Sequence, residues 1–170
     1  MIPLSYLNKI EIEPIGFVKR ASSEERVNDR SLVSQIVLKK ALSNALNGIE
    51  EWSHVYVIFW LHNVQPDEKL AHAKNRLTSH SVGVFATRAP IRPNPFGLTL
   101  VELVKHEENV LWTRGLDAFD GTPVLDIKPY PDWEQGQLIV VKDFRIPKWL
   151  EKLLNTKIHR KSKTESLRSI

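Results

Sequence analysis

The sequence contains no cysteine, and this absence excludes several classes of protein. Without cysteine, the 170-residue chain has no disulfide framework, no thiolate zinc site and no cysteine nucleophile. Residues 1–19 have no apolar stretch of the kind that a signal peptide carries. The longest apolar run, Val55–Leu61, is too short to span a bilayer. We therefore expect a cytoplasmic protein without a membrane-spanning segment.

Three common signatures of enzymes are also missing. The sequence has no G-x-G-x-G turn, which argues against a Rossmann-type domain. It has no G-x-S-x-G nucleophile elbow, which argues against a Ser-His-Asp hydrolase. Six histidines are present, but none stands at a recognisable ligand spacing, so we predict no metal site.

The composition is that of an ordinary globular domain. Hydrophobic residues make up 42% of the chain and charged residues 26%. The net charge is +4, which by itself does not indicate a nucleic-acid partner because a total says nothing about clustering. A chain of this length is sufficient for one domain with a hydrophobic core.

Most of the chain is typical of short strands separated by polar turns. Residues 54–61 are apolar on both faces, which predicts a strand buried on both sides. Further strands are expected at 33–38, 82–87, 98–105, 110–116, 124–128 and 138–141, with a hairpin at 106–109. Because few helices separate these strands, we predict a mainly β fold: a single-domain, antiparallel, barrel-like structure with one or two short helices and a C-terminal helix.

The helices are expected in two places. Apolar residues recur at helical spacing over 39–47, and Gly48 follows where a helix cap belongs. A second apolar stripe predicts a terminal helix over 147–157. We expect a barrel domain at 1–145 and a helix with a basic tail at 146–170. The basic segment 66–81 is interpreted as a solvated connection, with a contact to RNA as the alternative.

The most distinctive segment is GVFATRAPIRPNPFG at residues 83–97. Its three prolines predict a stiff loop, and Arg88, Arg92 and Asn94 on that loop suit phosphates, carboxylates or base edges. The alternative is that the prolines only block a strand edge while the arginines are solvated.

A second segment, DAFDGTPVLDIKPY, covers residues 117–130. Asp120 stands in a turn, where its carboxylate has either a functional role or a capping role. Asp126 and Lys128 alternate with apolar residues and should share one face of a strand, with a surface ion pair as the alternative interpretation.

These two segments, together with GIEEWSHVYVIFWLH at 48–62 and IGFVKR at 15–20, resemble the TsaA-like family. The resemblance covers residues 10–143. It implies a β-barrel-like domain that uses S-adenosylmethionine to methylate N6 of threonylcarbamoyl-adenosine beside the anticodon of tRNA. It also implies a homodimer with the cofactor near the subunit interface.

The resemblance assigns candidate residues to three roles. The cofactor positions are His62, Asn63, Arg88, Leu98, Leu116 and Asp117, and the substrate positions are Arg92, Asp126, Lys128 and Tyr130. Either Asn94 or Asp120 is the candidate catalytic group that orients the amine and accepts its proton. Two positions depart from the family pattern: Asn63 replaces a longer amide, and Ala21–Glu24 replaces the SPYK of bacterial members.

Two other functions remain as alternatives. One is a cofactor-independent RNA-binding barrel, although the intact Arg88, Asn94, Asp117 and Asp120 argue against it. The other is a methyltransferase that acts on a small-molecule acceptor. Steep salt dependence of binding would favour RNA, because contacts to several phosphates release counterions.

Overall fold

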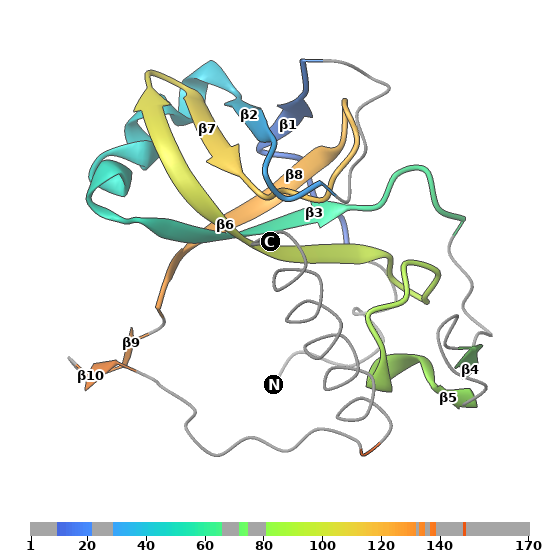
Figure 1. Cartoon of the computed structure of the whole chain (residues 1–170). Coiled ribbons are helices and arrows are strands. Elements are labelled where there is room, and N and C mark those ends of the chain that lie inside the picture. Colours follow the sequence, from blue (N-terminus) through green and yellow to red (C-terminus); the bar gives the residue numbers. More distant parts are fainter. Residues whose placement is uncertain are drawn as a thin grey trace, which may run out of the picture.

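The chain folds around a closed barrel of antiparallel strands, as the sequence predicts (Figure 1). The computed structural model describes residues 10–21, 29–65, 72–74, 81–131, 133–134, 137–138 and 148. The barrel order is β1-β2-β7-β6-β3-β8, and each neighbouring pair is antiparallel. Its strands are β1 (Gly16–Lys19), β2 (Val33–Leu38), β3 (His54–Trp60), β6 (Phe96–Glu107), β7 (Val110–Arg114) and β8 (Pro123–Tyr130).

Strand direction defines two ends of the barrel. Strands β1, β3 and β7 run toward one end, and β2, β6 and β8 start there. The opposite end carries the 3-10 helices η2 (Lys40–Leu46) and η3 (Ile49–Glu51), which connect β2 to β3. Figure 1 shows these helices beside the far ends of β6 and β7. Segments that are distant in sequence therefore meet at the first end, which we call the site end.

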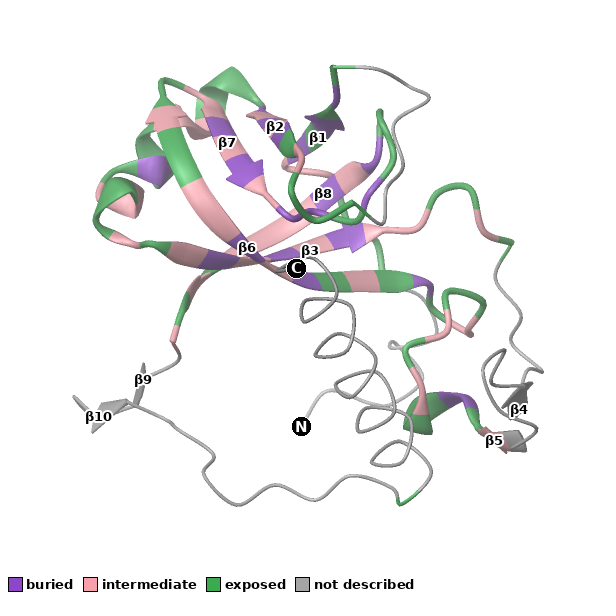
Figure 2. Ribbon diagram, viewed as in Figure 1, coloured by how far each residue is buried: buried purple, intermediate pink, exposed green. Residues whose placement is uncertain are grey.

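Side chains alternate between the barrel interior and its surface, as Figure 2 shows along the strands. On β3, Val55, Val57 and Phe59 are buried while the residues between them are half-buried. The prediction that this strand is buried on both sides was therefore wrong. In a closed barrel each strand has only one interior face, and the apolar residues of the other face pack along its exterior. Trp60 packs edge-on against Phe96 there, with ring centroids 5.3 Å apart.

The hairpin predicted at 106–109 is confirmed, with Glu107 paired to Val110 across the turn. Glu108 adopts a φ of 51°, in the left-handed region that a two-residue hairpin turn requires. Gly48 likewise adopts a φ of 85° where η2 gives way to η3, which agrees with its expected place at a helix end.

Three expected elements differ in the structure. The helix at 39–47 is a 3-10 helix, in which the Leu42 amide donates to the Lys39 carbonyl at 2.8 Å. Short helical connections often wind as 3-10 helices, and the single run Lys40–Leu46 is of this kind. The strand expected at 82–87 is shorter: β5 (Ser81–Gly83) precedes the 3-10 helix η4 (Val84–Ala86). β5 pairs with β4 (His72–Lys74), so the segment interpreted as a solvated connection contains a strand.

The chain beyond β8 is described only in part. β9 (Trp133–Glu134) pairs with β10 (Gln137–Leu138), and Lys148 is helical. The rest of the expected terminal helix, the basic tail and residues 22–28 lie outside the described residues. Within the described ranges, no helix has the length and apolar character needed to cross a membrane.

Candidate cofactor cavity at the end of the barrel

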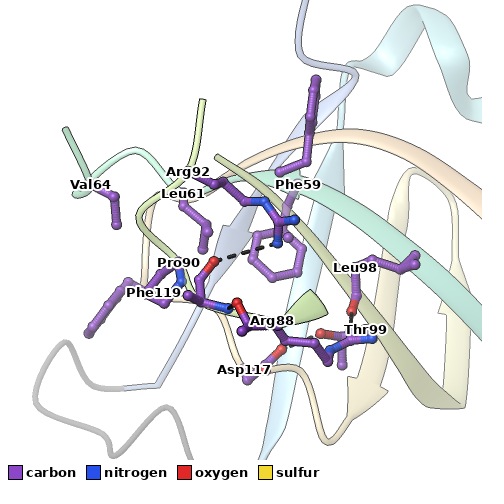
Figure 3. Close-up of a pocket in the computed structure, with 14 residues that line it drawn as sticks. Phe59, Leu61, Val64, Arg88, Pro90, Arg92, Leu98, Thr99, Asp117 and Phe119 are labelled. Atoms are coloured by element: carbon purple, nitrogen blue, oxygen red, sulfur yellow. Dashed lines mark hydrogen bonds between the residues drawn. The ribbon is translucent and has the colours of Figure 1, made fainter. Parts of the chain in front are cut away.

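A cavity of about 740 Å³ opens at the site end, between the Pro-rich loop, the end of β3 and the start of β6 (Figure 3). Apolar side chains form most of its wall, and three charged side chains reach it. The lining residues are Phe59, Leu61, Val64, Thr87, Arg88, Ala89, Pro90, Arg92, Phe96, Gly97, Leu98, Thr99, Asp117 and Phe119.

The wall depends on a close approach between Phe59 and Gly97. Phe59 is the last interior residue of β3, and Gly97 is its partner on β6. A Cβ atom on Gly97 would lie 2.2 Å from Cε2 of the Phe59 ring. Only glycine leaves room for the ring at this point, so a small residue on β6 determines where the aromatic wall of the cavity lies.

The two arginines come from the loop that the prolines stiffen. The Arg88 guanidinium donates a hydrogen bond from Nη2 to the main-chain carbonyl of Leu98. Arg92 donates from Nη1 to the Ala89 carbonyl at 3.5 Å. Thr87 closes the start of the loop, because its hydroxyl donates to the Val84 carbonyl at 2.8 Å. Arginine has five N–H donors, so each guanidinium keeps donors for an anionic ligand.

The acidic side of the cavity belongs to Asp117, which follows β7. The hydroxyl of Thr99 on β6 donates a hydrogen bond to Oδ1 of Asp117. Thr99 is only 5% exposed, whereas Asp117 is exposed at the cavity. A buried hydroxyl therefore orients a carboxylate that remains accessible. The other carboxylate lone pairs can accept hydrogen bonds from a ligand.

A smaller hollow of about 40 Å³ adjoins this cavity. His62, Asn63, Ala118 and Thr122 contribute to it. Leu61, Val64, Asp117 and Phe119 line both spaces and therefore form a shared wall. The ring Nδ1 of His62 lies 3.3 Å from the Thr122 hydroxyl, which holds the histidine beside the turn before β8.

The structure brings most of the predicted cofactor positions together. Arg88, Leu98 and Asp117 line the main cavity, while His62 and Asn63 line the adjoining hollow. Leu116 is different: it is fully buried in the barrel core and lines neither space.

The predicted catalytic and substrate positions fall into three groups. Arg92, assigned to the substrate, lines the main cavity. Asn94 and Asp120 are exposed close to the site end but line neither space, and Oδ1 of Asp120 accepts a hydrogen bond from the Arg20 amide at 2.8 Å.

The remaining substrate positions lie on the exterior of β8. Asp126 and Lys128 share one face, as predicted, and Tyr130 lies on it too; the three residues stand opposite Ile58, Tyr56 and His54 of β3. Lys128 and Asp126 form an ion pair of 2.9 Å, which confirms the surface ion pair that the sequence left as an alternative.

Sequence reasoning missed Phe59, Thr99 and Phe119 as lining residues. Phe59 looked like core because it stands in a continuous apolar run. Thr99 stands in no motif of its own; it meets Asp117 because the two residues continue the register of the β6–β7 hairpin, in which Glu102 pairs with Arg114. Phe119 could have been found, because it stands two residues after Asp117 and so shares its side of an extended segment.

Comparison with known proteins agrees with this geometry. A family model of the tRNA-methyltransferase O N-terminal domain matches residues 22–133. The chain belongs to this family. The match also confirms the TsaA-like resemblance of the motifs.

Individual relatives of this TrmO-type chain come from distant organisms. An S-adenosyl-L-methionine-binding protein of Archaeoglobus fulgidus is 40% identical over 126 residues, covering 70% of this chain and 88% of the relative. A tRNA (adenine(37)-N6)-methyltransferase of Rattus norvegicus is 39% identical over 137 residues, covering 74% of this chain and 32% of the rat protein.

Solved structures agree with the fold. A crystal structure of TrmO from Pseudomonas aeruginosa is 32% identical, with a TM-score of 0.62 over 82% of this chain and 61% of that chain. This chain therefore spans most of the archaeal relative but less than two thirds of the TrmO chain and about a third of the rat enzyme.

Proposed function

We propose that this protein is a methyltransferase that binds S-adenosylmethionine in the cavity and methylates N6 of an adenosine in tRNA. The observation that carries the proposal is the convergence of Arg88, Arg92 and Asp117 on one apolar cavity in a TrmO-type barrel. Relatives with this domain are named as S-adenosylmethionine-binding proteins and tRNA methyltransferases.

The donor set of the cavity suits this cofactor. The guanidinium groups of Arg88 and Arg92 match a carboxylate in charge and in geometry. The Asp117 carboxylate can accept hydrogen bonds from an ammonium group or from ribose hydroxyls. Phe59, Phe119 and their apolar neighbours offer flat surfaces to a purine. A volume of about 740 Å³ is in the range of cavities that hold ligands of this size.

When bound, the cofactor supplies an activated methyl group on its sulfonium. The protein contributes placement. Arg88 and Asp117 would hold polar groups of the ligand, and the apolar wall would limit the access of water to the reacting centre. The acceptor amine is a weak nucleophile because its lone pair is delocalised into the adenine ring. The site must therefore hold that amine in line with the methyl group, at a separation of ~3–3.5 Å.

For the acceptor side we propose that the Asn94 side chain orients the amine by hydrogen bonding and that the Asp120 carboxylate receives its proton. Both are exposed close to the cavity, on loops that precede β6 and β8. The main-chain carbonyl of Asn94 accepts a hydrogen bond from the Phe96 amide at 2.8 Å, which fixes the backbone at this point. The exposed side-chain amide can then bind a ligand. Asn94→Ala should lower the rate of methyl transfer while S-adenosylmethionine affinity is retained.

We assign the tRNA contact to Arg92 and to the exterior of β8, where Asp126, Lys128 and Tyr130 lie. An anticodon-loop base can be splayed out without melting a duplex, which suits a shallow cavity rim. We propose threonylcarbamoyl-adenosine as the acceptor, because the family resemblance implies this modified base.

We also propose that two copies of the chain pair through the exterior beside the cavity. Phe96 and Leu98, which also line the cavity, are 39% and 45% exposed there. Exposed apolar side chains in such a cluster favour association. Analytical ultracentrifugation should give twice the chain mass, and a monomer at all concentrations would contradict the pairing.

The deciding experiment is calorimetric titration of the full chain with S-adenosylmethionine. We expect saturable binding near one per chain, lost in Arg88→Ala. Arg114→Ala is the matched control, because Arg114 pairs with Glu102 at 2.7 Å on the barrel wall and lines neither space. Equal affinity of the wild type and Arg88→Ala would contradict the assignment of Arg88.

Transfer of a labelled methyl group then tests the acceptor, with tRNA that carries or lacks the threonylcarbamoyl group. Methylation of the modified tRNA alone supports the proposed substrate. Cofactor binding without transfer to either tRNA would favour a small-molecule acceptor. Absence of cofactor binding, with tRNA present or absent, would favour an RNA-binding barrel without methyltransferase activity.

A further inference from the structure

Arg20 is a buried arginine at the site end that lines neither the cavity nor the adjoining hollow. It follows β1 directly and is only 7% exposed. Arginine is almost never buried to this extent unless its guanidinium is engaged. Its position at the end of the IGFVKR block invites the question of what that guanidinium does.

The guanidinium forms hydrogen bonds with the segment that follows β7. Nη1 of Arg20 donates to the Leu116 carbonyl at 3.2 Å and to the Ala118 carbonyl at 3.0 Å. The Arg20 amide donates to Oδ1 of Asp120 at 2.8 Å. One residue therefore engages positions 116, 118 and 120, which are alternate residues of a single stretch.

The alternate pattern determines where the intervening side chains go. Leu116 and Ala118 are buried, with Ala118 reaching only the smaller hollow, whereas Asp117 and Phe119 are exposed and line both the cavity and the hollow. In an extended segment, successive side chains point to opposite sides. Holding the carbonyls of 116 and 118 therefore directs Asp117 and Phe119 to the opposite side, where they form the shared wall.

The hydrogen-bond ladder between β1 and β8 continues as far as Arg20 and Asp120. Gly16 pairs with Val124, and the Val18 amide donates to the Thr122 carbonyl at 2.9 Å. The Gly121 amide donates back to the Val18 carbonyl at 2.8 Å. One step further, the Asp120 carboxylate takes the place of a main-chain acceptor for Arg20. The contacts between Arg20 and segment 116–120 are thus continuous with the β1–β8 pairing of the barrel wall.

We propose that Arg20 is a positioning residue, which holds segment 116–120 so that Asp117 and Phe119 face the ligand. This inference rests on the proposed binding of S-adenosylmethionine in the cavity. Arg20 itself does not touch the ligand. Its contribution to affinity passes through the two side chains that it orients.

The test measures S-adenosylmethionine affinity by calorimetry and unfolding midpoints by calorimetric scanning in the same full-length variants. Arg20→Met removes every side-chain donor and keeps the main-chain amide. In Arg20→Gln the side chain ends two bonds short of the position of Nη1. Both should weaken affinity on the order of tenfold, because carbonyls that lose a charged donor no longer hold the segment. Wild-type affinity in either variant, if folded, overturns the proposal.

A matched control separates positioning from general loss of stability. Leu46 is a buried residue of η2 at the opposite end of the barrel. Leu46→Ala should lower the unfolding midpoint and leave the affinity unchanged when measured well below that midpoint. If Leu46→Ala weakens affinity as much as Arg20→Met at an equal loss of stability, Arg20 acts only as a structural residue and the proposal fails.

A double-mutant cycle with Asp117→Asn tests the route. If Arg20 acts through Asp117, the combined loss of affinity should be smaller than the product of the two separate losses. Independent losses that simply multiply would overturn this route. Failure of the wild type to bind the cofactor contradicts the proposed function itself, and that result precedes any comparison of variants.

Discussion

The hydroxyl of Thr99 donates a hydrogen bond to Oδ1 of Asp117 across the rim of the cavity. The two residues belong to β6 and to the segment after β7, and they continue the register of the β6–β7 hairpin beyond the pair Glu102–Arg114. Thr99 is buried and Asp117 is exposed. The carboxylate is thus oriented from inside the barrel while its other lone pairs face the cavity.

Thr99→Val should weaken S-adenosylmethionine binding about threefold to tenfold. Valine keeps the shape of threonine but removes the donor, and hydrogen bonds to charged groups contribute ~1.5–3 kcal/mol when buried, less at an exposed carboxylate. Calorimetry measures the affinity. Thr99→Ser, which keeps the hydroxyl, should restore most of it. Unchanged affinity in Thr99→Val would show that Asp117 needs no orientation from Thr99.

Gly97→Ala should weaken cofactor binding and lower the free energy of unfolding by about 1–3 kcal/mol, as overpacking does. The new Cβ would lie 2.2 Å from Cε2 of Phe59, so the ring must leave its place in the cavity wall. Thermal unfolding and calorimetry measure the two effects.

Gly48→Ala is the control for Gly97→Ala. Gly48 has a φ of 85° and open space around its Cα, at the end of the barrel away from the cavity. Alanine there should cost about 1–2 kcal/mol of stability through backbone strain alone. Its cofactor affinity should equal that of the wild type. An equal loss of affinity in both variants would mean that Gly97 matters only for stability.

Thr113→Val should stabilise the protein by about 1 kcal/mol. Thr113 and Ser34 are buried, face each other on paired strands, and their hydroxyls make no hydrogen bond within the described ranges. Removing an unsatisfied hydroxyl removes its desolvation penalty. For a chain of this length the unfolding midpoint should rise by roughly 2–4 °C.

Thr122→Val gives the opposite expectation, because the Thr122 hydroxyl lies 3.3 Å from Nδ1 of His62. Losing that partner should lower the unfolding midpoint.

A lower midpoint for Thr113→Val would show that its hydroxyl is satisfied by a buried water or by Ser34.

Lys128→Ala should weaken tRNA binding and leave cofactor affinity unchanged. Lys128 lies on the exterior of β8, where its partner Asp126 is 2.9 Å away. Loss of one phosphate contact should reduce the slope of log affinity against log salt by about 1. Lys39→Ala is the control, since Lys39 forms a similar ion pair with Glu13 at 3.0 Å near the opposite end. An unchanged salt slope in Lys128→Ala would remove Lys128 from the RNA interface.

The sequence was sufficient to predict the position of most barrel strands and to identify the family motifs. Short apolar stretches separated by polar turns predicted β2 at Val33–Leu38 and the hairpin between β6 and β7. The spacing of Asp126 and Lys128 placed them on one face of β8. The two arginines of the Pro-rich loop indicated a binding site, because a guanidinium binds anionic groups in any fold.

Tertiary structure alone decided which of these residues meet. Local pattern could not show that one face of β3 is only half-buried, because an apolar run looks the same in a fully buried strand and in a barrel wall with a packed exterior. It could not pair Arg20 with the carbonyls of 116 and 118, since those contacts join residues 96 and 98 positions apart in the sequence. Closure of the barrel creates them, and closure is a property of the whole chain.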